Sequence, residues 1–88
     1  MESILRVNIP IQIISCTDTD GKITPLKFRF EDKSGKLITV NIDKILSSDK
    51  ISMGVNFVCT SMNYNLQREF RLRYSHVDHT WKMTDIQA

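Results

Sequence analysis

Glycine, proline and cysteine are all scarce in this sequence, which has 3 Gly, 2 Pro and 2 Cys among its 88 residues. So little glycine and proline excludes a collagen-like or low-complexity chain, and the abundance of Ile, Leu, Val and Phe excludes a disordered one. No run of residues approaches the ~20 apolar positions that a membrane-spanning helix needs. Two cysteines are too few for a disulfide framework. We therefore expect Cys16 and Cys59 to be reduced thiols in a cytoplasmic protein.

An excess of charge of one sign is also missing, because 12 Lys and Arg residues face 10 Asp and Glu residues and leave a formal charge of +2. That value is far from the dense positive field of an obligate nucleic-acid binder, so any basic surface must be local. A chain of this length buries roughly 60% of its unfolded surface, enough for one modest core. We expect residues 1–88 to form a single domain with no secretory signal, because Glu2 and Arg6 interrupt the pattern that a signal requires.

What the sequence does contain is alternation of apolar and polar residues, the period of a half-buried β-strand. The alternation starts at residues 5–13, where Pro10 predicts an edge, a bulge or a strand start, so we expect this strand to bend or to lie at an edge. It resumes in five later segments, which are separated by polar clusters typical of turns. The clusters lie at residues 18–22, 31–36, 47–50, 62–65 and 75–80. Ile42, Ile45 and Leu46 instead have helical spacing, which favours one or two turns of helix near 43–48.

Short strands with frequent turns predict an all-β domain, built as a small, strongly bent antiparallel sheet or open barrel of five to six strands. One side of each strand supplies the expected core, and burial of Phe28 and Trp81 is its decisive test. The predicted core comprises Val7, Ile9, Ile11, Leu26, Phe28, Phe30, Val40, Ile42, Phe57, Phe70, Leu72 and Trp81.

The segments 9–11, 20–30 and 40–46 form a pattern with four later residues, Phe70, Leu72, Tyr74 and Trp81. This pattern resembles a family of short, uncharacterised bacterial proteins. The resemblance covers about two thirds of the chain and consists mostly of hydrophobic alternation and turns. It implies a stand-alone cytoplasmic domain, and it transfers no catalytic residue to this sequence.

Three short motifs have residue types that are used in catalysis or metal binding, and each has a simpler structural interpretation. His76, Asp78 and His79 could ligate zinc, but they lie in a predicted turn without the third or fourth ligand that a site needs. The segment 18–21 resembles the start of a calcium loop, yet it lacks the closing glutamate and favours a hairpin turn. Cys59 beside His76 or His79 could form a nucleophile and base, but Cys59 alternates with the buried residues of its strand, where a thiol behaves as a small apolar residue. We therefore predict no enzyme activity, metal, cofactor or small-molecule substrate.

Two kinds of binding remain. Lys27 and Arg29 on one strand, and Arg71 and Arg73 on another, point outward, so adjacent pairing of these strands would gather four cations for contact with phosphates or a partner. Glu31 and Glu69 lie in the same rows and could neutralise that face through cross-strand ion pairs. Nearly all aromatic residues face inward, which leaves only Tyr64 in a turn and Tyr74 at a strand end for base stacking.

Protein interaction or self-association is the second kind, and it demands the fewest special residues. An edge strand near Pro10 could accept a peptide strand. Outward aliphatic residues could add an adhesive patch, and the candidates are Ile4, Ile14, Leu37 and Val58. We predict a non-enzymatic binding module without membrane association, for protein interaction or assembly, with nucleic-acid binding through the basic strand face as the alternative.

Overall fold

The computed structural model describes residues 4–63 and 66–87, and these residues form an all-β structure as predicted. They contain seven strands, so the predicted count of five to six is wrong. The strands are β1 (Ile4–Thr17), β2 (Ile23–Glu31), β3 (Leu37–Asn41), β4 (Lys44–Ile51), β5 (Gly54–Asn63), β6 (Leu66–Ser75) and β7 (Thr80–Gln87). Within this described part of the chain, no helix is long and apolar enough to span a membrane.

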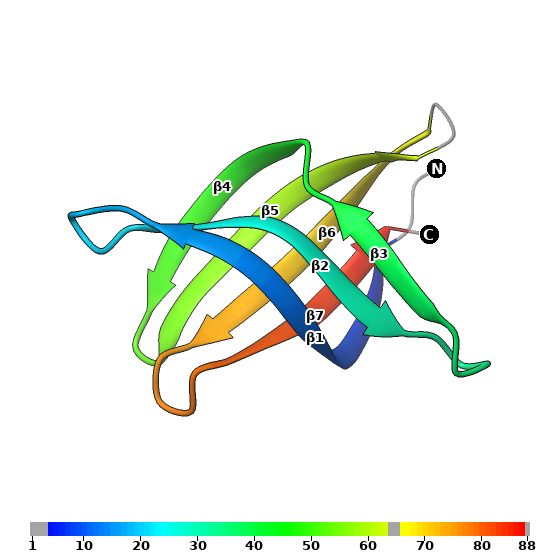
Figure 1. Cartoon of the computed structure of the whole chain (residues 1–88), viewed down its shortest axis with the longest axis horizontal. Helices are drawn as coiled ribbons and strands as arrows, with labels where there is room; N and C mark the ends of the chain where they lie inside the picture. Colours follow the sequence, from blue (N-terminus) through cyan, green and yellow to red (C-terminus); the bar gives the residue numbers. More distant parts are fainter. Residues whose placement is uncertain (1–3, 64–65, 88) are drawn as a thin grey trace.

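All seven strands belong to one antiparallel sheet with the order β3-β2-β1-β7-β6-β5-β4. Strand β1 belongs to both halves of the sheet, because its residues 4–11 pair with β7 and its residues 12–17 pair with β2. Between Arg6 and Ile9, β1 has one residue more than β7, and such a bulge bends a strand. The predicted strong bending is therefore confirmed, and the sheet curls into a half-barrel with β1 and β2 crossing in front of β6 and β7 (Figure 1).

Pro10 does not lie in an edge strand, because β1 is internal in the strand order. Pro10 is paired with Lys82 of β7, and β2 pairs with β1 only from Gln12 onward. A residue without an N–H is tolerated here because β1 has a ladder partner on one side only at this point.

Residues 43–48 do not form the predicted helical turn, and they account for the additional strand. Lys44–Ile51 is β4, which pairs with β5 from Lys44 to Ile51. Leu46 is an extra residue in this ladder, since Ile45 and Ser47 face consecutive residues of β5. The bulge makes the spacing of Ile45 and Leu46 look helical, although the backbone is extended.

The core lies inside the curled sheet, where both halves contribute aromatic side chains. Phe28 is 1% exposed and Trp81 is 8% exposed, which confirms the decisive prediction about the core. Phe57, Phe70 and Leu72 are also buried as predicted. The remaining predicted members are partly buried against this cluster, with one exception; these members are Val7, Ile9, Ile11, Phe30, Val40 and Ile42.

Leu26 is the exception, because it is 46% exposed and does not belong to the core. In the pairing of β2 with β1, Lys27 faces Ile14 while Pro25 faces the next residue, Ser15. Leu26 is therefore the extra residue of a second bulge, and the alternation changes phase there. Pro25 takes the inward position that the uninterrupted pattern assigned to its neighbour.

Three turns follow the chemistry that the sequence predicts, whereas the polar cluster 47–50 is not a turn: it lies inside β4, and the turn before β5 is at residues 52–53. Asp18 Oδ1 accepts hydrogen bonds of 2.9 Å from the N–H groups of Asp20 and Lys22, and Gly21 has a positive φ of 83°. Residues 32–36 repeat this arrangement around Asp32, and residues 76–79 form the turn before β7. Met62 and Asn63 of the predicted turn 62–65 belong to β5. Tyr64 and residue 65 lie outside the described residues.

Candidate functional site

The four predicted cations do not form one face. Lys27 and Arg29 lie on β2, whereas Arg71 and Arg73 lie on β6, and the strands β1 and β7 separate β2 from β6. The sequence shows which side of a strand faces outward, but it does not reveal that these two strands are not neighbours. The expected gathering of four cations through adjacent pairing is therefore wrong.

Three of these cations are held by neighbours on the surface of the sheet. Arg29 donates hydrogen bonds to Gln12 Oε1 on β1, with its Nε at 3.0 Å. Arg73 Nε donates to Asn56 Oδ1 on β5 at 2.9 Å. Such contacts fix the direction of each guanidinium group, while its other N–H groups remain available.

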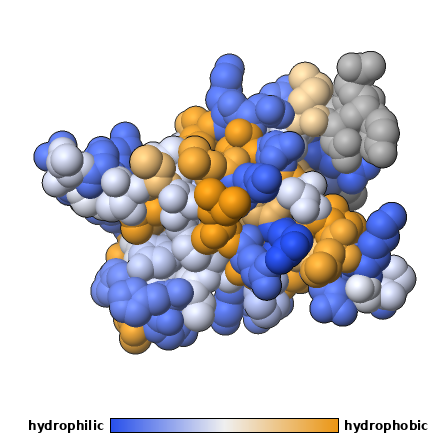
Figure 2. All heavy atoms as spheres, in the orientation of Figure 1, coloured by the Kyte–Doolittle hydropathy of each residue, from blue (hydrophilic) through white to orange (hydrophobic). Residues whose placement is uncertain are grey.

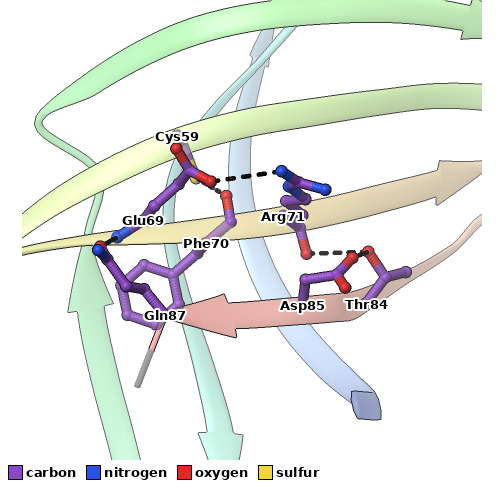
Figure 3. A network of polar contacts seen from close by, with 7 residues as sticks. All are labelled: Cys59, Glu69, Phe70, Arg71, Thr84, Asp85 and Gln87. Carbon is purple, nitrogen blue, oxygen red and sulfur yellow. Dashed lines mark hydrogen bonds and ion pairs between the residues drawn. The ribbon is translucent and has the colours of Figure 1, made fainter. Parts of the chain in front are cut away.

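Arg71 forms the ion pair found among the described residues, with Nη2 3.6 Å from Glu69 Oε2. This pair lies along one strand rather than across two, so the predicted cross-strand arrangement is not the one observed for Glu69. Figure 3 shows that the pair belongs to a network between β6 and β7, in which the Thr84 hydroxyl donates to the Arg71 carbonyl at 3.3 Å. Gln87 Oε1 accepts a hydrogen bond from the Glu69 N–H at 2.8 Å. The network joins β6 to β7 where Thr84 forms a bulge.

A groove of about 550 Å³ lies beside Arg73 and contains two further cations, Arg6 and Lys82. Sequence reasoning missed both of these residues, although Lys82 lies between the inward residues Trp81 and Met83 and must therefore point outward. Lys82 is directly opposite Arg73 in the pairing of β7 with β6. The cationic neighbours of Arg73 are thus Arg6 and Lys82, and not Lys27 and Arg29 of β2 as the sequence predicted.

A second groove, of about 340 Å³, lies between the edge strand β3 and the strands β5 and β6. Its apolar part comes from both halves of the sheet and includes Phe30, Val40 and Phe70. Arg68 on β6 and the buried Ser61 on β5 supply polar groups. Residues 38–41 of β3 form one wall, so this groove runs beside an edge strand.

The two edge strands of the sheet differ in their protection. β4 has the charged residues Lys44, Asp49 and Lys50 and also contains a bulge, and these features obstruct pairing with another chain. β3 has the sequence LITVN, with no charge, no proline and a regular register against β2. Five residues is an ordinary strand length, so β3 is not protected by shortness either.

The aliphatic residues predicted to form an adhesive patch are distributed over three strands. Ile4 and Ile14 are exposed but lie near opposite ends of the long β1, and Val58 on β5 is partly buried. Leu37, which is exposed, lies on the edge strand β3. Figure 2 shows hydrophobic residues reaching the surface over β2 and β3, with hydrophilic residues between them.

The histidines of the turn before β7 contact different neighbours. His76 Nε2 lies 3.2 Å from the Ser52 carbonyl oxygen, and His79 Nδ1 lies 3.1 Å from the Tyr74 hydroxyl. Among residues 4–63 and 66–87, no group of three or more potential ligands could hold a metal ion.

Cys59 is fully buried in the core, and its thiol lies 3.5 Å from the Phe70 carbonyl oxygen, to which it donates. Burial, followed by the charge of Glu69, raises the pKa of this thiol to about 12. The nucleophilic form, the thiolate, is thus suppressed at neutral pH. Because an unfolded thiol ionises near pH 9.0, the stabilising effect of keeping Cys59 neutral is lost as the pH rises from 9.0 to about 12.

We expect Ellman's reagent, near neutral pH, to modify one thiol in the folded chain, the exposed Cys16, and both cysteines after unfolding in urea. The matched control is Cys16→Ser, which should leave the folded protein unreactive. Rapid modification of this variant under native conditions would show that Cys59 is accessible and reactive, contrary to its burial.

No family model, curated protein or solved structure matches this chain.

Proposed function

We propose that this protein is a small interaction module that binds an extended segment of a partner protein along β3, and that it is not an enzyme. The observation that supports this function is the edge of β3, which has no charge, proline or bulge and lies beside a groove with apolar and polar lining, whereas β4 at the other edge is protected by charges and a bulge. A cytoplasmic setting, predicted from the sequence, is part of the proposal.

Strand addition would satisfy the free backbone groups of β3 and fill the groove at the same time. A peptide strand that pairs with an edge gains main-chain hydrogen bonds, and its alternate side chains enter pockets beside the edge. Ile38 and Val40 are partly buried and lie on the side of β3 that faces the groove, while Leu37 and Thr39 are exposed. Alternate apolar side chains of the added strand would therefore continue this inward row.

The groove also specifies one polar feature of the partner. Arg68 lies in its wall, and among the described residues no acidic side chain is within ion-pair distance of Arg68. An acidic side chain in the bound segment would complement this cation. The expected ligand is an extended peptide with apolar residues at alternate positions and one Asp or Glu.

The test is selection of peptides from a random display library on the immobilised protein, followed by binding measurements with the enriched peptides. We expect sequences with alternating apolar residues and an acidic residue. Thr39→Lys introduces on β3 the type of charge that protects natural edges, and it should weaken binding at least about tenfold. Ser48→Lys places the same charge on the other edge, β4, and should change the affinity less than about twofold.

Equal binding by wild-type protein and Thr39→Lys would contradict the proposal, as would the absence of any enriched peptide. Analytical ultracentrifugation of the protein without peptide tests whether a second copy of the chain, rather than a partner, binds the β3 edge. If the protein dimerises and Thr39→Lys abolishes the dimer, β3 pairs with β3 of a second copy. That result would overturn the proposal of a separate partner protein.

A further inference from the structure

The positive charge of the protein is concentrated on one face of the sheet. We define the β6–β7 face as the outward side of β6, β7 and the first half of β1, where four of the 12 basic residues lie, namely Arg6, Arg71, Arg73 and Lys82. Only two of the 10 acidic residues, Glu69 and Asp85, belong to the same strands. Charged residues elsewhere in the chain balance in number, so this face accounts for the whole net charge of +2.

One row across this face contains two cations and no acid. The pairings place Asn56 of β5, Arg73 of β6, Lys82 of β7 and Pro10 of β1 side by side. Like charges directly opposite each other on neighbouring strands are destabilising. Neither flanking residue can neutralise Arg73 or Lys82, so an anion bound between them would relieve a repulsion that is built into the sheet.

The next row contains two cations around a single acid. Asp85 of β7 is opposite Arg71 on one side and Arg6 on the other. One carboxylate therefore faces two guanidinium groups, and the Thr84 hydroxyl shares its hydrogen between Asp85 Oδ2 at 3.0 Å and the Arg71 carbonyl oxygen at 3.3 Å. Arg71 has Glu69 as a further partner, which leaves Arg6 as the cation of this row with the weakest neutralisation.

These rows meet in the groove of about 550 Å³, whose cations are Arg6, Arg73 and Lys82. Hydroxyl groups of Ser75, Thr80 and Thr84 also line the groove, but their hydrogens already point to Asp78, to Asp85 or to the Arg71 carbonyl oxygen. The three cations are therefore the donors that the groove offers to an anion. Two acids, Asp78 and Asp85, are part of its lining. Hydrogen bonds from Thr80 and then Ser75 lower the pKa of Asp78 and hold its carboxylate within its own turn, so the lining contains three cations against two ionised acids.

We propose that this groove binds the phosphate groups of a single-stranded nucleic acid, independently of base sequence and of the β3 edge. Arginine matches phosphate geometry through paired N–H donors, and the Nε contact with Asn56 orients Arg73 while leaving its terminal N–H groups free for a ligand. Cations in two rows suit several phosphates along a backbone better than one isolated anion.

The aromatic residues explain why the bases are not read. Trp81 is buried, and its ring packs against Tyr74 with centroids 5.0 Å apart. Tyr74 lines the groove, but its ring packs on Trp81 and its hydroxyl contacts His79 Nδ1, so this single partly buried ring does not form the row of exposed aromatics that base stacking uses. Recognition therefore depends on the backbone alone and should be strongly sensitive to salt.

The test is fluorescence anisotropy with labelled single-stranded DNA of mixed sequence, roughly 12 nucleotides long. Contacts from three cations predict that affinity falls about 20-fold between 50 and 200 mM salt. The variant Arg73→Glu with Lys82→Glu should lower the affinity at least about tenfold. Lys27→Glu with Arg29→Glu makes the same change in net charge on β2 and should change it less than about threefold.

Two further measurements keep the result interpretable. Arg73→Gln with Lys82→Gln replaces the charge-reversed variant if thermal melting shows that the latter does not fold, and it should also weaken binding. Inorganic polyphosphate should compete with the labelled DNA, because the groove recognises phosphate, whereas Thr39→Lys on β3 should leave DNA binding unchanged.

Equal weakening by the β2 and groove variants would show that binding follows total charge and would overturn the assignment to the groove. The absence of salt-sensitive binding to DNA would overturn the proposal itself. Binding that polyphosphate does not displace would also overturn it, because base contacts would then be required.

Discussion

Replacing Phe28 by alanine is expected to lower the free energy of unfolding by about 3–5 kcal/mol. Phe28 is 1% exposed and contacts aromatic rings of both halves of the curled sheet. Its ring stacks on Phe30 of β2 with centroids 6.1 Å apart, and it forms a T-shaped pair with Phe70 of β6 with centroids 5.5 Å apart. Because β2 and β6 share no ladder, truncation would remove side-chain contacts that the backbone cannot replace.

The matched control for this prediction is Leu26→Ala, two positions away on the same strand. Uninterrupted alternation would place both side chains inside, but the bulge leaves Leu26 exposed, so its truncation should cost less than about 1 kcal/mol. Urea denaturation of the two variants measures the difference. Similar losses of stability would mean that the bulge is absent and that β2 keeps a single alternating phase.

Replacing Gly54 by alanine should destabilise the protein by at least about 3 kcal/mol, at the upper end of the range for overpacking. A Cβ atom at Gly54 would lie 1.7 Å from the Tyr74 carbonyl oxygen, which is an atom of the neighbouring backbone. Gly54 is paired with Ser75 at the end of the β5–β6 ladder. The clash cannot be relieved by turning a side chain, so the strands must separate.

Gly21→Ala is the control that distinguishes this clash from the general cost of replacing a glycine. Gly21 has a positive φ of 83° but nothing within 4 Å of an added Cβ atom, so its substitution should cost only about 1–2 kcal/mol of backbone strain. Thermal or urea unfolding compares the two variants. A smaller loss for Gly54→Ala than for Gly21→Ala would contradict the close approach of β5 and β6.

Local patterns predicted much of the fold because they depend on neighbours in the sequence. The period of two identified the inward set of most strands, and Phe57, Phe70 and Trp81 are buried as it requires. The predictions were wrong where a bulge shifted the alternation of inward and outward residues, at Leu26 in β2 and at Leu46 in β4. A bulge is favoured by the partner strand and by the curvature of the sheet, which a sequence does not display.

The candidate surfaces were less predictable than the core. Outward positions of Arg71 and Arg73 followed from alternation, but their actual neighbours, Lys82 and Arg6, depend on strand order. The sequence also does not locate the unprotected edge, because it contains several strands with few charges and does not show which of them lies at the edge of the sheet. β3 is an edge because all the other strands pair with one another in the order that ends at β2, and its own residues do not show this.

The scarcity of glycine, proline and cysteine by itself excluded a collagen-like chain and a disulfide framework. The alternation of apolar and polar residues by itself determined that this chain forms an all-β structure with an aromatic core. Backbone geometry and turn chemistry operate over a few residues, so the sequence states them directly. Only the tertiary structure decided which strands adjoin, which edge is open and where the surplus charge of +2 gathers. These features depend on contacts between distant segments, whose order is set by how the bent sheet buries its core.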